Sequence, residues 1–239
     1  MKPKKKVLIV LSIVIIIAII TIMIMLYKSG NKKIQILMDM SKKIYRVNEY
    51  KDDNIYFKTE NNYGYTEVYK YFETTKSITY DKNTHLKYTI IKNSDMTEID
   101  YLESDDDITK IMCKRSVEKD NTFELGDELF TNNEVHLFQV IKYGLKIEMS
   151  NENINGKNCY ILNYVDNNTI YYIDQETLLP IKIVNQIIDE RGNESLETTY
   201  YDIQYNNVIE NDVQKLDEEN FIIVDENQFD EYYDEQLKR

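Results

Sequence analysis

The sequence predicts a mainly β domain of the α+β class, an antiparallel meander with accompanying helices, preceded by one transmembrane helix. Three observations lead to this prediction. Residues 7–27 form a long uncharged apolar run near the N-terminus. Beyond Asp52, apolar and polar residues alternate with the two-residue period of half-buried strands. Clusters of Asn, Asp and Gly separate these alternating runs, as turns between strands do.

The composition is that of a folded, acidic domain. The 239 residues include only 6 Gly and 2 Pro, and they contain enough β-branched and aromatic residues to build a core. No Pro/Gly/Ser-rich linker divides the chain after the apolar run, which favours one domain over two. The net charge is −13, and the four lysines before the apolar run are not balanced by any acid, so residues 28–239 carry −17. Such a charge repels nucleic acid, and nucleic-acid binding is excluded.

The apolar run, Val7–Tyr27, has 21 residues, of which only Ser12 and Thr21 are polar. At about 1.5 Å per helical residue it spans roughly 30 Å, the thickness of a bilayer's hydrocarbon core. The preceding MKPKKK resembles a secretory signal, but the run is longer than a typical signal core and no small-x-small cleavage site follows. Neither cysteine lies near its end, which excludes a lipid-modified cysteine. We therefore expect an uncleaved signal anchor.

The charges around the anchor predict its orientation. Four lysines and the terminal amine precede it, whereas three lysines follow it closely. The positive-inside rule then places the C-terminal domain outside the cytoplasm. The expected organisation is a cytoplasmic basic tip (1–6), a single-pass membrane anchor (7–27), a polar spacer (28–33) and an extracytoplasmic domain (34–239) with an acidic C-terminal segment.

The domain is expected to begin with a helix over about 33–48. Its apolar residues recur at three- and four-residue spacing, as in Ile34, Leu37, Met38 and Ile44. This stripe could lie at a lipid interface, but packing against the domain's own sheet is the favoured interpretation. A second helix, capped by Asn132 or Asn133 and ending near Gly144, is expected to interrupt the strands.

Two series of alternating runs predict the strands. The first series covers residues 55–60, 65–73, 77–80, 85–92, 97–102 and 108–113. The second series covers residues 145–149, 158–165, 169–174, 181–188 and 196–205. The acidic stretch after Glu210 still contains apolar residues at regular spacing, so a short strand near 221–224 and an amphipathic helix near the C-terminus are expected.

Residues 154–162 and 169–183, followed by 199–208, resemble the strand–strand–turn pattern of the outer-membrane lipoprotein carrier (LolA/LolB-like) superfamily. The resemblance covers about 55 of the 239 residues. The residues that carry the motif are Tyr172, Ile173, Asp174, Glu176, Thr177, Leu179 and Pro180. It implies a strongly curved antiparallel sheet or incomplete barrel with covering helices, able to hold a lipid or acyl chain between sheet and helices. A tethered chain without a lipid-attachment cysteine does not shuttle between membranes, so the resemblance implies holding or sensing.

The motifs of common catalytic and metal sites are absent from the sequence. There is no phosphate loop, dinucleotide fingerprint or G-x-S-x-G, and His85 and His136 lack the spacing of a metal site. The acidic run at Glu103 and 105–107 lacks the spacing of a calcium loop and is interpreted as a solvated turn. We therefore expect no cofactor, no metal and no enzymatic activity.

Cys113 and Cys159 allow two interpretations. A disulfide between them would close a loop of about 46 residues and stabilise the domain by roughly 4 kcal/mol. Alternatively, they are two separate buried thiols that behave as small apolar residues.

Three functions remain open at this stage. The leading hypothesis is a membrane-anchored, non-enzymatic domain that binds or senses an apolar ligand. The second is a structural or interaction module of the cell envelope whose acidic face docks a basic protein or envelope partner. The third is a cell-envelope enzyme.

Overall fold

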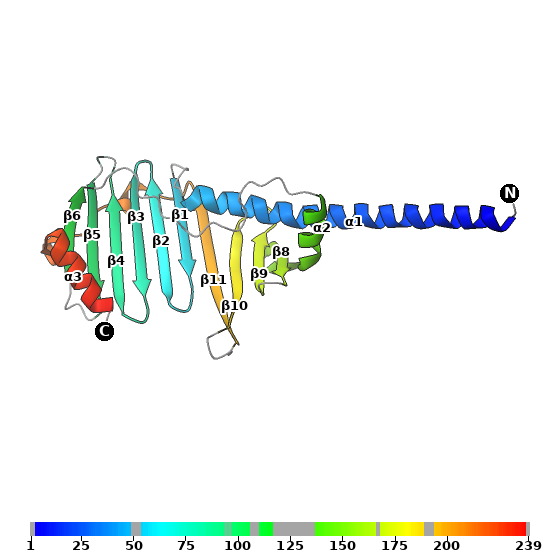
Figure 1. The fold of residues 1–239 in the computed structure, drawn as a ribbon. Coiled ribbons are helices and arrows are strands. Elements are labelled where there is room, and N and C mark those ends of the chain that lie inside the picture. The colour runs from blue at the N-terminus through cyan, green and yellow to red at the C-terminus, as the bar shows by residue number, and fades with distance from the viewer. Residues whose placement is uncertain are drawn as a thin grey trace.

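A computed structural model describes residues 3–48, 54–93, 95, 97–105, 110–116, 137–165, 168–188 and 194–237. Its strands form a single open sheet in the order β12-β6-β5-β4-β3-β2-β1-β11-β10-β9-β8-β7 (Figure 1). The strands are β1 Asn54–Glu60, β2 Gly64–Tyr71, β3 Thr74–Asp81, β4 Leu86–Lys92, β5 Thr97–Ser104, β6 Lys110–Ser116, β7 Ile147–Ile154, β8 Lys157–Tyr164, β9 Thr169–Asp174, β10 Pro180–Ile188, β11 Glu194–Tyr205 and β12 Ile222–Ile223. The helices are α1 Pro3–Asn48, α2 Leu137–Lys146 and α3 Glu226–Leu237, with 3₁₀ turns η1 Glu210–Val213 and η2 Glu218–Asn220. This confirms the predicted α+β class.

Helix α1 is one unbroken helix of 46 residues that extends far beyond the sheet at its N-terminal end (Figure 1). It contains one segment, within Ile13–Ile44, that is long and apolar enough to cross a membrane. The sequence predicted a polar spacer at residues 28–33 between two helices. The structure corrects this, because the spacer is itself helical and joins the two predicted helices into one.

Two antiparallel meanders make up the sheet. Strands β1 to β6 follow one another, strands β7 to β11 do the same, and β1 pairs with β11 through a register that sets Phe57 opposite Ile203. The alternation in the sequence predicted both meanders. The β1–β11 pairing that joins them connects segments about 140 residues apart, and no local pattern reports such a pairing.

The register divides the sheet into two faces. Face A carries the cross-strand row that runs from Leu162 in β8 and Tyr171 in β9 to Ile183 in β10. The same face continues through Phe57 and Val68 to the β4–β6 end. This follows because residues that are paired directly across two strands lie on the same face of the sheet. Face B is the opposite side of the same strands.

The C-terminal segment crosses the sheet on face B and then changes face. Leu216 and Phe221 pack on Ile99 and Tyr101, and the Phe221 and Tyr101 rings meet edge to face with centroids 5.0 Å apart. Strand β12 then pairs in parallel with β6, and α3 follows around this edge onto face A. The predicted terminal strand and helix are confirmed, while the parallel pairing departs from the expected all-antiparallel sheet.

Helix α2 confirms the predicted second helix, but its end differs from the prediction. The helix continues to Lys146, so Leu145 and Lys146 belong to it and not to the following strand. The predicted caps, Asn132 and Asn133, lie outside the described residues.

Candidate functional site

Face A is covered by helices at both ends of the sheet. At the β7–β10 end, the C-terminal half of α1 places Ile34, Leu37 and Met40 on the apolar side chains of β8 and β9. Lys43 of α1 donates a hydrogen bond to the carbonyl oxygen of Thr177 in the turn after β9. The apolar stripe predicted for residues 33–48 therefore packs on the domain's own sheet, as the favoured interpretation had it.

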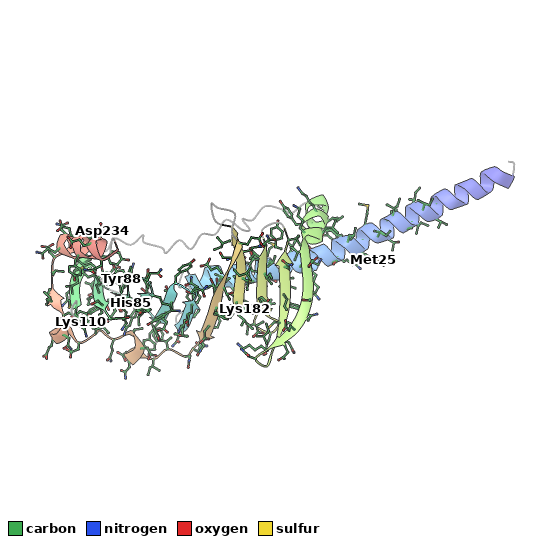
Figure 2. The ribbon with its side chains drawn as sticks, turned by 90° about the horizontal axis from the view of Figure 1, so that it is seen from below. Met25, His85, Tyr88, Lys110, Lys182 and Asp234 are labelled. Carbon is green, nitrogen blue, oxygen red and sulfur yellow. The ribbon has the colours of Figure 1, made fainter. Side chains whose placement is uncertain are left out.

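Helix α3 covers the other end of face A. Phe229 is only 1% exposed and packs on Leu102, Ile111 and Cys113. Its ring lies 6.0 Å from that of Tyr88, which Figure 2 shows at the end of the sheet far from Met25 on the exposed part of α1. The buried Phe229 and the partly buried Tyr232 and Tyr233 together anchor this acidic helix on the sheet.

Arg115 holds a buried ionic cluster beneath α3. Its Nε lies 2.6 Å from Oδ2 of Asp100, and its Nη2 donates to Oδ1 of Asp230 on α3 over 2.6 Å. Asp100 is 1% exposed, and its Oδ1 has no hydrogen-bond partner. Burial and the nearby negative charge of Glu98 raise the pKa of Asp100, whereas the positive charge of Arg115 lowers it. The net result is a pKa of about 6.

This cluster lacks an activated nucleophile. Cys113, whose Sγ lies 3.9 Å from Asp100, is fully buried, and burial raises its pKa to about 11. The thiol is therefore protonated at neutral pH and inert. The geometry indicates that the cluster attaches α3 to the sheet and does not point to catalysis.

Between the two helical covers, an apolar strip crosses face A. It consists of Ile55, Phe57, Val68, Tyr201 and Ile203, and the first three are at most 6% exposed. Among the described residues, this cluster contains side chains from β1, β2 and β11 alone, whereas the clusters at both ends include helical residues.

An open cavity of about 210 Å³ adjoins this strip at the ends of the same strands. On the face A side it is lined by four threonines, Thr59, Thr66, Thr79 and Thr199, and by the carboxylate residue Asp81. Thr59 and Thr66 each lie two residues along their strands from Phe57 and Val68 respectively. The polar lining of the cavity, which we call the mouth, thus lies next to the buried apolar strip, whose residues are not part of that lining.

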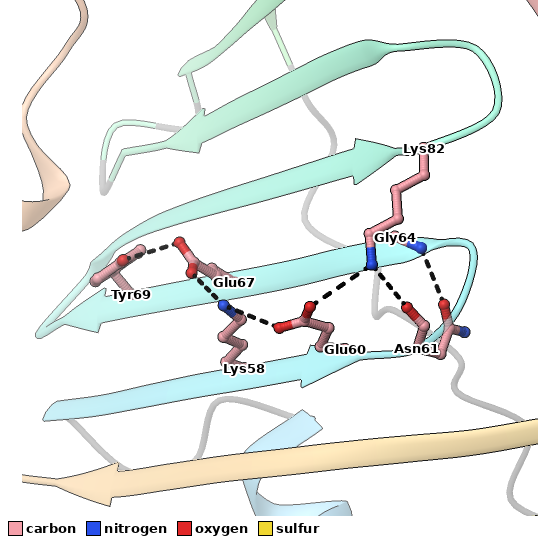
Figure 3. A network of polar contacts seen from close by, with 7 residues as sticks. All are labelled: Lys58, Glu60, Asn61, Gly64, Glu67, Tyr69 and Lys82. Atoms are coloured by element: carbon pink, nitrogen blue, oxygen red, sulfur yellow. Dashed lines mark hydrogen bonds and ion pairs between the residues drawn. The ribbon is translucent and has the colours of Figure 1, made fainter.

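On face B near this mouth, the charged side chains compensate one another (Figure 3). Lys58 lies between Glu60 at 3.4 Å and Glu67 at 3.3 Å, and Tyr69 donates to Glu67 over 3.1 Å. Lys82 closes the network by contacting Glu60 at 3.6 Å. Such mutual pairing stabilises the hairpin and does not prepare a reactive group. A second cavity, of about 270 Å³, lies on face B between the sheet and η1 and is lined mainly by polar residues.

The residues of the family-like motif form scaffold. Asp174 accepts hydrogen bonds from the backbone N–H groups of Glu176 at 2.8 Å and Thr177 at 3.3 Å, and Leu179 is buried. Pro180 starts β10 opposite Ile173, at the strand position where proline is tolerated. These residues turn the chain, with Tyr172 stacked beneath the ammonium group of Lys182 at 4.1 Å.

The two cysteines are free and buried. They lie on β6 and β8, nine strand positions apart at about 4.8 Å each, and on opposite faces of the sheet. A disulfide needs Cα atoms within about 7 Å, so the structure decides against the bridge between Cys113 and Cys159.

Of the two histidines and the acidic turn, the structure describes His85, Glu103 and Asp105. His85 is exposed, with its Nδ1 3.1 Å from Oδ2 of Asp105, and His136 lies outside the described residues. Within the described ranges, no group of three or more His, Cys, Asp and Glu side chains could hold a metal ion. The arginine of the ionic cluster was not foreseen, because nothing in the sequence marks Arg115, Asp100 and Asp230 as neighbours.

Comparisons with known proteins show distant likenesses. No family model and no curated protein matches the chain. Among solved structures, the Pseudomonas aeruginosa MucA/MucB complex is similar with 12% identity and a TM-score of 0.26, and the match covers 78% of this chain and 63% of that one. A LolA superfamily protein from Nitrosomonas europaea is similar with 11% identity and a TM-score of 0.21, over 76% and 96% of the two chains. TM-scores below 0.5 carry no argument, so membership of the LolA/LolB-like superfamily stays a prediction.

Proposed function

We propose that the chain is a membrane-anchored, extracytoplasmic, non-enzymatic domain that holds an amphiphile, a lipid or acyl chain, on face A. The observation that carries the proposal is the open, threonine-rich cavity that lies directly beside the apolar strip. Hydroxyls of the mouth can donate to and accept from a polar head group. Since Phe57 and Val68 are closed to solvent, the acyl chain enters through the mouth and reaches the strip by parting the side chains that are packed on it.

The energetics favour an apolar occupant. Apolar surface removed from water contributes about 25 cal/mol per Å², so an acyl chain gains more from the strip than a polar ligand does. An anionic ligand is disfavoured at the mouth, because Glu60 and Asp81 line it together with the threonines.

Photocrosslinking tests this proposal in the full chain. The protein is reconstituted in nanodiscs that contain a lipid with a diazirine on its acyl chain, irradiated, and mapped by peptide mass spectrometry. We expect crosslinks in the peptides of β1, β2 and β11 in addition to those in residues 7–27. Crosslinks confined to residues 7–27 would contradict binding on face A.

A matched pair of variants sharpens the test. Val68→Phe fills the strip on face A and is expected to reduce the sheet crosslinks while leaving those in α1 unchanged. Ile78→Phe makes the same kind of change on face B and serves as the control. Equal crosslinking in both variants would overturn the proposed position of the ligand.

The extracytoplasmic placement is tested separately by adding protease to intact cells. We expect cleavage within residues 34–239. Protection of this whole region until the cells are opened would reverse the topology.

A second candidate function is supported by α3, whose outer surface is acidic. Glu226, Asp230, Glu231, Asp234 and Glu235 are all exposed on this one helix. A basic protein of the cell envelope would complement this surface. If the crosslinking experiment fails and a lysine-rich partner binds with strong salt dependence, the interaction module is the better description.

A further inference from the structure

The end of the domain nearest the apolar part of α1 has a charge and surface unlike the rest. Residues 28–239 carry −17, yet the chain has no acid before Asp39 and none in α2. Lys28 and Lys142 are both exposed at this end. Lysines are therefore the charged residues of α2 and of α1 before Asp39, although Glu148 of β7 is exposed nearby.

Close contact between two glycines fixes the height of α2 along α1. A Cβ on Gly144 would lie 2.2 Å from Cα of Gly30, so the two helix backbones touch. Lys33 adds hydrogen bonds from its Nζ to the carbonyl oxygens of Gly144 at 2.9 Å and Ile147 at 2.6 Å. Because α1 is continuous and Gly30 lies three residues beyond Tyr27, α2 crosses about 4.5 Å above the end of the apolar run.

Three apolar side chains at this level are exposed to solvent. Leu145 and Tyr143 of α2 are 62% and 41% exposed, and Val165 in the turn after β8 is 49% exposed. The backbone N–H of Val165 donates to the carbonyl oxygen of Lys146 over 2.9 Å, which brings the turn against the end of α2. We call Leu145 and Val165, together with Lys28 and Lys142, the basal patch, whereas Tyr143 lies two helical positions from Leu145 and therefore on another side of α2.

We propose that the basal patch seats the domain on the bilayer that α1 anchors, with its apolar side chains in the interfacial layer and its lysines on anionic headgroups. Apolar side chains flanked by lysines are typical of helices that lie in the membrane interface. The lysines are attracted to an anionic surface. The strands cross α1 in Figure 1, so the seated sheet extends away from the membrane from β7 to β6.

This inference rests on the membrane anchor of the proposed function. The test therefore uses one fluorescent probe in the anchor and another in the basal patch. The chain contains no Trp, and each probe is a single-tryptophan variant of the full chain in vesicles of phosphatidylcholine and phosphatidylglycerol. Leu145→Trp reports the patch and Ile17→Trp reports the anchor. Leu196→Trp is the matched control, because Leu196 is 66% exposed but lies on β11, four strand positions from the edge strand β7.

We expect Leu145→Trp to emit at shorter wavelength than Leu196→Trp and to be quenched by spin labels on lipid headgroups, whereas Leu196→Trp is not quenched. Ile17→Trp should be quenched by bromine deep in the acyl chains. If Leu145→Trp behaves like Leu196→Trp while Ile17→Trp is quenched, the anchor stands and the basal patch is wrong. If Ile17→Trp is not quenched, the anchor and the inference fall together.

The lipid charge provides a second measurement. Quenching of Leu145→Trp should weaken in vesicles of phosphatidylcholine alone, and Lys142→Glu should weaken it in the mixed vesicles. Quenching that is insensitive to both changes would overturn the role given to the lysines.

Discussion

Arg115 shows how one side chain connects parts of the molecule that are far apart in sequence. Its partners, Asp100 and Asp230, come from β5 and α3, and the second is 115 residues away. Asp100 is the buried member, and the charge of Arg115 only partly offsets the cost of burying its carboxylate. The pH at which Asp100 titrates therefore reports how strongly Arg115 stabilises the ionised form.

We predict that replacing Asp100 changes the pH dependence of stability. A folded-state pKa of about 6, against the ordinary 3.8, corresponds to roughly 3 kcal/mol. The folded protein holds this proton more tightly than the unfolded chain, so Asp100 contributes stability at low pH that is lost as the pH rises from 3.8 to about 6. Chemical denaturation of the wild type and Asp100→Asn should show their stability difference falling with pH by up to this amount. A difference that stays constant or rises would show that Arg115 keeps Asp100 ionised.

The thiols provide a second prediction for single residues. Both cysteines are fully buried, and burial raises the pKa of each. We expect alkylation of the unreduced native protein to be very slow, and alkylation after denaturation to add two labels by intact mass. No label after denaturation without reductant would restore the disulfide.

At the level of the elements, helices α1 and α2 are joined by their glycine contact. A Cβ on Gly30 would lie 2.6 Å from the carbonyl oxygen of Val140, which is backbone and cannot move aside cheaply. In an ordinary helix interior, Gly to Ala stabilises by about 1 kcal/mol. Here the clash of the added Cβ with the neighbouring helix costs more than the higher helix propensity of alanine gains.

We therefore predict that Gly30→Ala and Gly144→Ala each destabilise the domain by about 1–3 kcal/mol, the usual cost of overpacking. Ser29→Ala, at an exposed position of the same helix, is the control and should be neutral. Thermal unfolding of all three in nanodiscs gives the comparison. Gain of stability in either glycine variant would show that the helices are separated in solution.

Helix α3 is attached by the buried Phe229, by the partly buried Tyr232 and Tyr233, and by the ion pair between Arg115 and the exposed Asp230. Phe to Ala at a buried site costs about 3–5 kcal/mol, and α3 lies at the end of the chain, so we predict that Phe229→Ala undocks this helix without unfolding the sheet. Hydrogen exchange should rise in α3 and in β6 but not in β8 to β10. Asn227→Ala, an exposed change on the same helix, should leave exchange unaltered. Uniform acceleration in the whole sheet would mean that α3 belongs to the global folding unit.

For the whole molecule, the continuity of α1 determines how the domain stands relative to the anchor. A polar spacer would let the domain tumble, whereas a packed helix through residues 28–33 holds it in one orientation. The elongated sheet then places the α3 end, with its ionic cluster, farthest from the anchor (Figure 1).

Proteolysis distinguishes these two arrangements. We predict that trypsin leaves Lys28, Lys32 and Lys33 uncut in the reconstituted protein, because these residues are helical and Lys33 is engaged with α2. Asn31→Pro removes a helical hydrogen bond and should make Lys28 a cleavage site. Rapid cutting of the wild type at these lysines would show that the spacer is extended.

The sequence by itself determined the local features of this protein. The apolar run, the two-residue alternation of both meanders and the three- and four-residue spacing before Tyr45 are periodicities that a few adjacent residues express. They predicted the α+β class and almost every strand. The polar residues at 28–33 were misleading, because helix propagation and packing against α2 outweigh their composition.

Only the tertiary structure decided which distant residues meet. The β1–β11 pairing, the placement of α1 and α3 on the same face, the separation of the cysteines, and the cluster around Arg115 all depend on contacts across a hundred residues or more, or on strand order. Such contacts form when the apolar faces of several elements are buried together. The periodicity of the sequence shows which residues make up an apolar face, but it does not show which element packs against that face. The threonine mouth and the basal patch belong to this second class, which is why neither was foreseen.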